Sequence, residues 1–331
     1  MNIAVVYLGK KLPRYVSENI KYIRNNFSNI NIYFVTDNFI SSKKIQKIKG
    51  INTFVAKKDS DFSLFSNQTT HNLEFRDGFW KHTFNRFFAL RELISEINLR
   101  DVVQIEADVL MNPSFNFEKF MELEIEIAFP LETIDKGAAS FLFVKDLNSL
   151  DEFLEFSRKS INSVNSETDM TLLGKYHRAH PEKTFILPTF VNFTENSDLD
   201  YDYSTNYKFF NSIFDSTTLG LFLVGRDPRN SRGWSKINFT DPGHLVDFSK
   251  VTFIPVKQSF PLIDFGNQRV EINCIHVHSK ELKYFRNPIK SLNRAVKRIE
   301  GKERYEFHLL VFLQLSGKFL RRHLTRRKIP G

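Results

Sequence analysis

Residues 2–8 read Asn-Ile-Ala-Val-Val-Tyr-Leu, and this stretch decides the fold class. It is strongly apolar with only weak alternation, which is typical of a strand buried on both faces of a parallel sheet. Residues 13–26 follow with apolar side chains at approximately helical spacing, and residues 31–35 form a second β-rich run. This strand–helix–strand order predicts an α/β sheet with a right-handed crossover.

The same periodicities extend the sheet along the chain. Residues 79–97 predict a long helix, and residues 101–105 predict a third strand that ends directly at Glu106-Ala107-Asp108. Residues 220–225 are largely apolar, and we interpret them as a strand that ends in a turn. The other expected elements are strands at 125–130, 138–144 and 272–277 and helices at 150–160, 169–176 and within 288–327.

The composition is that of a folded globular protein. The chain has 331 residues, 41% hydrophobic and 26% charged, so one large domain or two ordinary ones can bury a sizeable core. Its single cysteine, Cys274, excludes an internal disulfide framework and a cysteine-based zinc cluster. No apolar run reaches the roughly 18 residues of a membrane-spanning helix. The N-terminus has no basic leader before its apolar run, so we expect a cytoplasmic protein.

Positive charge is concentrated at the C-terminal end. The net charge is +9, but residues 280–331 hold 15 Lys and Arg against 4 Asp and Glu, whereas the preceding 279 residues hold 32 against 34. A basic tail of this kind usually serves an anionic surface, either nucleic acid or the inner leaflet of a membrane. Leu and Phe side chains interleave the cations over residues 290–327, as in a helix that lies in a membrane interface. A helix packed on the rest of the protein, with a solvated basic face, is the alternative.

Two carboxylates follow the third predicted strand. Glu106 and Asp108 are one residue apart, at the edge where open α/β sheets bind ligands. Divalent cations prefer such oxygen ligands, and Mg²⁺ or Mn²⁺ shares them with substrate phosphates. A solvated acidic turn is the competing interpretation. Two literal Asp-x-Asp sequences, at residues 59–61 and 198–202, do not follow a strand as directly, and we interpret them as loop acids.

A second polar cluster follows the last predicted strand. His276 and His278 share a face of an extended strand, because side chains alternate with period two. Neutral imidazole ligates Mn²⁺, and the following Lys280 has the charge to neutralise a diphosphate. For each histidine alone, a local hydrogen bond is the simpler interpretation.

Other catalytic motifs are missing from the sequence. No G-x-G-x-x-G follows the first strand, which argues against an ordinary dinucleotide site. Residues 220–227 have the spacing of a Walker phosphate loop, but Arg226 and Asp227 replace its Lys and Ser/Thr. No G-x-S-x-G occurs, and Cys274 lies in an apolar strand where packing is expected.

Taken in order, these features resemble a bacterial nucleotide-sugar glycosyltransferase of the GT-A fold, of the surface polysaccharide or lipopolysaccharide type. The chain is also distantly similar to the glycogenin-like family. The resemblance covers residues 1–285 and depends on the order of its parts rather than on one motif. Those parts are the opening strand, Val35-Thr-Asp37-Asn, the aromatic-basic helix at 78–88, Glu106-Ala-Asp108, the small-residue strand at 136–144, the acidic segment at 167–173, and His278.

The resemblance implies a Rossmann-like, mixed and mostly parallel sheet flanked by helices, with Mn²⁺ or Mg²⁺ at the site. Asp108 and His278, with Glu106, would hold the cation across the diphosphate of a nucleotide sugar. Glu106 departs from the usual aspartate and has a longer reach. The residues that we expect to contact the donor are Thr36, Asp37, Arg86, Glu106, Gly137 and Lys280.

Two further aspartates are expected near the sugar. Asp215 is the predicted general base on an acceptor hydroxyl if the enzyme inverts configuration. Asp169 is predicted to position the donor if the enzyme retains the configuration at the anomeric carbon. A helix cap or a loop acid is the alternative for each. The sequence does not decide between the two stereochemical courses.

The predicted organisation is a catalytic domain at 1–285 and a basic helical tail at 286–331. Within the first, a donor half covers about 1–145 and an acceptor half about 146–285. The expected function is transfer of a sugar to a glycan or lipid-linked acceptor, with peripheral attachment to an anionic membrane through the tail. A metal-dependent nucleotidyltransferase or phosphohydrolase is the first alternative. A non-enzymatic RNA-binding protein is the second, although we expect no nucleic-acid partner.

Overall fold

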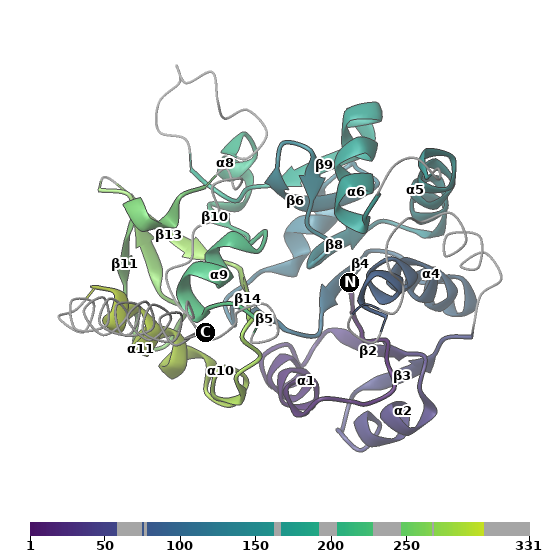
Figure 1. Ribbon diagram of the computed structural model, residues 1–331, viewed down its shortest axis with the longest axis horizontal. Coiled ribbons are helices and arrows are strands. Elements are labelled where there is room, and N and C mark those ends of the chain that lie inside the picture. The colour runs from purple at the N-terminus through teal and green to yellow at the C-terminus, as the bar shows by residue number, and fades with distance from the viewer. Residues whose placement is uncertain are drawn as a thin grey trace, which may run out of the picture.

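The computed structural model describes residues 1–57, 75, 78–161, 167–191, 204–227, 246–266 and 268–300. Its largest sheet has eight strands in the order β3-β2-β1-β4-β8-β6-β7, and β9 pairs with β6 off this path (Figure 1). The β3-β2-β1-β4 half is wholly parallel, whereas β8 and β7 run antiparallel to their neighbours. These strands are β1 (Asn2–Val6), β2 (Asn31–Thr36), β3 (Asn52–Val55), β4 (Val102–Glu106), β6 (Ile127–Thr133), β7 (Lys136–Gly137), β8 (Phe141–Val144) and β9 (Thr184–Leu187).

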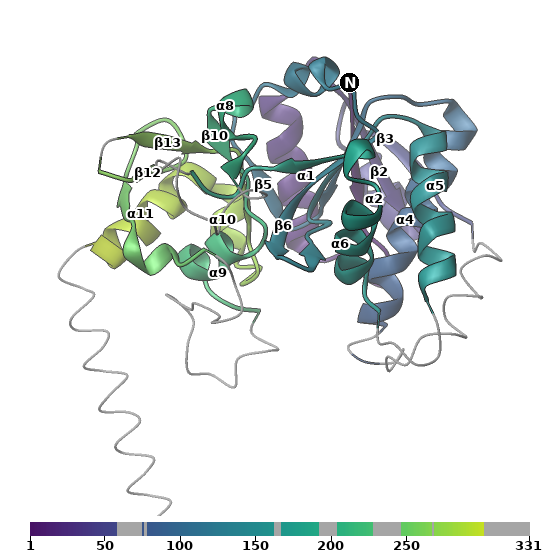
Figure 2. The same ribbon diagram turned by 90° about the horizontal axis from the view of Figure 1, so that it is seen from above.

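Helices cover both faces of this sheet, because its central strands are apolar on both sides. In β1, Ala4 and Val6 pack in one core with the helices α4, α5 and α6, and Ile3 and Val5 pack in another with α1 and α2. Figure 2 shows α1 on one side of the strands and α4 and α5 on the other. The helices are α1 (Arg14–Asn26), α2 (Phe39–Ile45), α4 (Phe79–Ile97), α5 (Leu147–Ser160) and α6 (Asp169–Ala179). The predicted α/β class, with a mostly parallel sheet flanked by helices, is confirmed.

A second group of elements lies beside the main sheet. It contains a four-stranded sheet in the order β10-β13-β12-β11 and a two-stranded antiparallel ribbon of β5 and β14. Its strands are β5 (Val109–Met111), β10 (Ser212–Ile213), β11 (Thr252–Ile254), β12 (Leu262–Asp264), β13 (Arg269–Ile272) and β14 (Cys274–His276). Its helices are α8 (Tyr207–Phe210), α9 (Thr218–Val224), α10 (Leu282–Arg286) and α11 (Pro288–Glu300).

Two expected strands differ in the structure. Of the run at 220–225, predicted as a strand, residues 220–224 belong to helix α9 and Gly225 caps its C-terminal end. A short apolar run does not distinguish a buried strand from a buried helix, and here the carboxylate of Asp215 accepts the N–H groups of Thr217, Leu219 and Gly220 at the start of the helix. The strand predicted at 272–277 is divided between β13 and β14, and Asn273 lies between them.

Some expectations fall on segments that the structure does not describe. These are the loop acids at 59–61 and 198–202 and the tail from residue 301 onward. Within the described part of the chain, no helix is long and apolar enough to cross a bilayer.

Candidate metal centre

The carboxyl end of β4 positions the two acidic residues. Val6 in β1 lies in register with Glu106, the last residue of β4, so the carboxylate leaves the sheet where the parallel strands end. The chain then turns through Ala107 and enters β5 after Asp108. Because open α/β sheets bind ligands at this edge, both acids stand where a site is expected.

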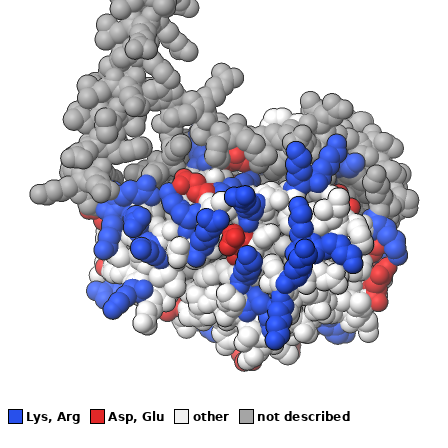
Figure 3. Space-filling model, turned by 90° about the horizontal axis from the view of Figure 1, so that it is seen from below, with Lys and Arg blue, Asp and Glu red and all other residues white. Residues whose placement is uncertain are grey.

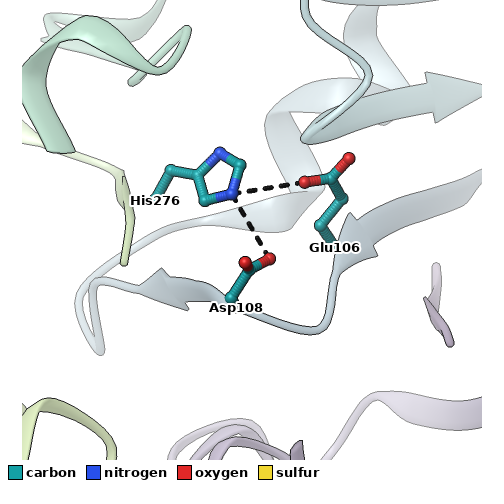
Figure 4. A group of neighbouring side chains, drawn as sticks. All are labelled: Glu106, Asp108 and His276. Atoms are coloured by element: carbon teal, nitrogen blue, oxygen red, sulfur yellow. Dashed lines mark ion pairs between the residues drawn. The ribbon is translucent and has the colours of Figure 1, made fainter. Parts of the chain in front are cut away.

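The β5–β14 ribbon brings a histidine to the two acids. Val109 pairs with His276 in the antiparallel ladder, and the N–H of Val277 donates to the carbonyl of Asp108 at 2.8 Å. His276 Nε2 lies 3.3 Å from Glu106 Oε2 and 3.3 Å from Asp108 Oδ1 (Figure 4). One ligand atom from each residue lies within 4.8 Å of the others.

This donor set fits a hard divalent cation. Two ligands at right angles on an octahedral ion with bonds of about 2.1 Å are about 3 Å apart, close to the separations observed here. Two carboxylates and one imidazole suit Mn²⁺ and Mg²⁺ better than a soft ion, which prefers thiolate. The structure therefore shows a possible site for a divalent metal and does not identify the ion.

Cationic side chains flank the triad on both sides. Arg86 from α4 is 7% exposed and forms ion pairs with Glu106 and Asp169. Lys280 Nζ lies 3.4 Å from Asp108 Oδ2 and 3.3 Å from Asp227 Oδ2. The carboxylates of these four ion pairs, Glu106, Asp108, Asp169 and Asp227, therefore each have a cationic side chain beside them.

The charges around Asp108 determine its ionisation. Burial raises the pKa of this carboxyl, but His276 and Lys280 act in the opposite direction and hold the pKa well below its usual range. The carboxylate is therefore ionised, as a metal ligand has to be.

The metal histidine expected from the sequence was His278, and the structure instead brings His276 to the acids. The strand β14 ends at His276, and the N–H of His278 donates to the carbonyl of His276, so the chain has already turned. His278 Nε2 lies 3.1 Å from the carbonyl oxygen of Thr217, and its ring stacks on that of His276 with centroids 3.8 Å apart. Burial lowers the pKa of His278 well below its usual value.

Asp215 has the contacts of a structural residue. It is 2% exposed, and its two oxygens accept the backbone N–H groups of Thr217, Leu219, Gly220 and His276 at 2.8 to 3.1 Å. Burial raises its pKa, and the hydrogen bonds from these backbone groups oppose that change. Its predicted role as general base stays untested, but four backbone donors favour a role in holding α9 against β14.

The other predicted donor residues are distributed around the same edge. Thr36 ends β2 and its hydroxyl accepts the N–H of Asn38, while Asp37 accepts the N–H of Gly9 at 2.9 Å. Gly137 is buried in β7, where an added Cβ would come closer than 3.0 Å to the ring of Phe129. This glycine is therefore required by packing, and a contact with donor stays a prediction.

Sequence reasoning did not include one residue of this cluster, and it named His278 as the metal histidine where the structure brings His276 to the acids. Asp227 pairs with Lys280, and in the sequence it stands out only as a departure from the Walker pattern. Period-two alternation placed His276 and His278 on one face and did not choose between them. The deciding signal is the pairing of β14 with β5, which no local pattern reveals.

No protein-family profile matches the chain, and no curated protein sequence is similar to it. Several solved structures are remotely similar. Mouse xyloside xylosyltransferase 1, in its apo form, is 10% identical with a TM-score of 0.41, over 61% of this chain and 92% of that one. Core-mannan synthase A from Aspergillus fumigatus, in a Mn/GDP form, is 11% identical with a TM-score of 0.40, over 56% and 72% of the two chains.

A third remotely similar structure is that of a nucleotidyl-transferring enzyme rather than a sugar-transferring one. The cytidylyltransferase from Leptospira borgpetersenii is 12% identical with a TM-score of 0.35, over 61% of this chain and 80% of that one. All three likenesses are remote, so the activity has to be argued from the chemistry of the site.

Proposed function

We propose that the protein is a metal-dependent glycosyltransferase that moves a sugar from a nucleotide-diphosphate donor to a hydroxyl of a glycan or lipid-linked acceptor. The observation that carries the proposal is the convergence of Glu106, Asp108 and His276 at the carboxyl end of β4. A surface polysaccharide or lipopolysaccharide is the acceptor class that we infer. Residues 1–285 would form the catalytic domain, with the basic segment from 286 onward as an appendage.

The triad would hold the cation, which supplies Lewis-acid stabilisation of the charge that develops on the leaving diphosphate. Lys280 and Arg86 each pair with two carboxylates. Placed on either side of the triad, they are suited to share phosphate charge when a donor binds, because an anionic ligand can replace a carboxylate partner.

The sugar would lie on the Arg86 side of the triad. Asp169 is the first residue of α6, is 4% exposed, and binds the guanidinium that also contacts Glu106. It would therefore position Arg86 and the donor. In the transfer itself, the acceptor oxygen bonds to the anomeric carbon, the bond to the diphosphate breaks, and the hydroxyl proton leaves to a base.

Binding of Mn²⁺ and nucleoside diphosphates, measured by titration calorimetry and by thermal shift, tests the proposal. A ligand that binds only the folded protein at a hundred times its Kd raises the free energy of unfolding by about 2.7 kcal/mol. We expect one nucleotide to bind only with the metal in the wild type and binding to be lost in Asp108→Asn. The matched control is Asp247→Asn, which changes a carboxylate that caps a short 3-10 helix outside the triad.

The reaction products then distinguish the activities. Formation of a glycosylated acceptor from the donor that binds supports the transferase. Pyrophosphorolysis or hydrolysis of the nucleotide without sugar transfer would instead identify a nucleotidyltransferase or a phosphohydrolase. If neither Mn²⁺ nor Mg²⁺ binds the folded wild type, with or without nucleotide, the triad is an ion-pair cluster and the proposal is wrong.

A further inference from the structure

One face of the protein carries a concentration of cations that the metal centre does not use. Figure 3 shows Lys and Arg side chains gathered over the face where Figure 1 places α11, α10, α1 and α2, with few acidic side chains between them. The helices α10 and α11 together carry six Lys and Arg and one Glu. Residues 39–50, which contain α2, carry four Lys and no acid. We refer to the surface formed by these two segments and α1 as the basic face.

Two large apolar side chains project from this face. Phe39 and Ile40, the first residues of α2, are 64% and 66% exposed. Ser41, Ser42 and Ile45 form the buried side of the helix, so the exposed side pairs two apolar residues with lysines. Lys43 Nζ lies 5.2 Å from the centre of the Phe39 ring. Adjacent exposed apolar side chains flanked by lysines are the pattern of a helix that lies in a membrane interface.

A groove at the other end of the basic face is lined with cations. It has a volume of about 1110 Å³ and lies between the segment at 255–258, α1 and the helices α10 and α11. Its charged lining residues are Lys257, Arg286, Lys290, Arg294 and Lys297, all exposed. The polar groups beside them are those of Tyr22, Gln258, Asn287 and Asn293. Among the residues that the structure describes, none that lines this groove is acidic, so the groove suits an anionic group.

We propose that the basic face docks on a lipid bilayer that contains anionic lipid. Phe39 and Ile40 would enter the interfacial region, and the cations of the groove would lie against headgroup phosphates. A bilayer fits better than a nucleic acid, because exposed apolar residues and cations on one broad surface both make favourable contacts with it. This inference concerns the folded part of the chain, so it does not depend on the tail or on the metal centre.

Co-sedimentation of the full chain with phosphatidylcholine vesicles, with and without phosphatidylglycerol, tests the docking. We expect binding that requires phosphatidylglycerol and weakens with salt. The double variant Phe39→Ser/Ile40→Ser should bind at least about ten-fold more weakly, since it removes the inserting side chains. The variant Lys290→Glu/Arg294→Glu should bind at least about twenty-five-fold more weakly, because each lost cation near such a surface is worth about five-fold.

Matched variants elsewhere keep the test specific. Ile134→Ser removes a side chain that is 64% exposed in the turn between β6 and β7. Lys159→Glu/Lys208→Glu makes the same charge change at exposed positions of α5 and α8. Both should bind vesicles like the wild type. As a second measurement, the variant Phe39→Trp should gain a blue-shifted emission relative to the wild type on adding anionic vesicles, and Ile134→Trp should not.

Three results would overturn the proposal. Equal binding by the wild type and both basic-face variants would place any membrane attachment elsewhere in the chain. Binding that ignores phosphatidylglycerol would remove the role of the cations. Absence of vesicle binding, with salt-sensitive RNA binding that the groove variant loses, would identify the face as a nucleic-acid surface.

Discussion

Asp108 and Asp215 are both buried carboxylates, 7% and 2% exposed, and both contact His276, yet their surroundings differ in kind. Asp108 faces the side chains of His276 and Lys280. Asp215 faces four backbone N–H groups, one of which belongs to His276. His276 therefore lies between two regions: its side chain contacts Asp108, whose partners are side chains, and its N–H contacts Asp215, whose partners are backbone N–H groups.

The difference shows which carboxylate can exchange its partners. The lysine side chain can rotate away from Asp108 and pair with a phosphate, and the neutral imidazole of His276 can stay in place and share a cation with the carboxylate. Backbone N–H groups in a helix start and a strand cannot move without disrupting those elements. We therefore expect changes at Asp108 to affect function and changes at Asp215 to affect stability.

The largest expected effect on stability is that of Asp215→Ala. It leaves four buried N–H groups without their acceptor, so the free energy of unfolding should fall by about 3–5 kcal/mol. Urea unfolding measured by circular dichroism checks this value. Asp108→Asn is the comparison, and its loss should be smaller, about 1–2 kcal/mol, because the charge that His276 and Lys280 stabilise is removed but His276 still pairs with Glu106 and Lys280 with Asp227. Equal losses from both variants would contradict the division into two regions.

Gly220→Ala should have the next largest effect, because α9 and β14 approach closely at this residue. An added Cβ would come closer than 3.0 Å to the carbonyl oxygen of His276 and to Asp215 Oδ2. We expect a loss of about 2–4 kcal/mol, although Ala usually favours a helix by about 1 kcal/mol over Gly. Because β14 has to shift, Mn²⁺ affinity should fall as well.

The matched control for this change is Gly174→Ala in α6. Its Cβ would press on the backbone carbonyl of Asp135 instead. A similar loss of stability with unchanged metal affinity is the expected outcome for the control. If Gly220→Ala is stable and binds metal normally, α9 does not fix the position of His276.

Local sequence patterns predicted three of the four strands in the parallel half of the sheet, β1, β2 and β4, but not β3. The strand at 2–8, the helix at 13–26 and the helix at 79–97 were each marked by spacing within one segment, and the structure places β1, α1 and α4 there. The acids at the end of β4 were also visible, since a buried strand that stops at two carboxylates is a local feature. These elements could be predicted because the information lies within about 20 consecutive residues.

The second half of the molecule depends on pairings between distant segments. Residues 218–224 form a helix because Asp215 anchors their N–H groups and β14 packs against them. His276 rather than His278 reaches the acids because β14 pairs with β5, which is more than 160 residues away in sequence. Neither fact has a local signature: the short apolar run was predicted as a strand, and period-two alternation did not choose between the two histidines.

Arg86→Lys tests the region around the triad, where side chains rather than backbone groups make the contacts. The guanidinium contacts Glu106 through one nitrogen and Asp169 through another, and a lysine ammonium lacks this fork. We expect transfer activity to fall about 10–100-fold and stability to fall by about 1 kcal/mol. Steady-state kinetics with the identified donor, together with urea unfolding, measures both.

Arg91→Lys on the same helix is the control for this prediction. Arg91 pairs with Asp151 at the surface, where both side chains are more than a third exposed. Its replacement should leave activity unchanged and alter stability by less than about 0.5 kcal/mol, as for most exposed ion pairs. If the two variants behave alike, Arg86 has no positioning role at the triad.

The smallest expected effect is on the labelling rate of Cys274, which lies in β14 between the two regions. It is 1% exposed and pairs with Met111 in the ladder. In native buffer the thiol should not react with a disulfide reagent, and it should react fully in urea, so its labelling rate follows opening of β14. Asp215→Ala and Gly220→Ala should raise that rate, and Asp108→Asn should not. Rapid labelling of the native wild type would mean that β14 opens locally, in which case the backbone donors around Asp215 do not hold His276 against the acids.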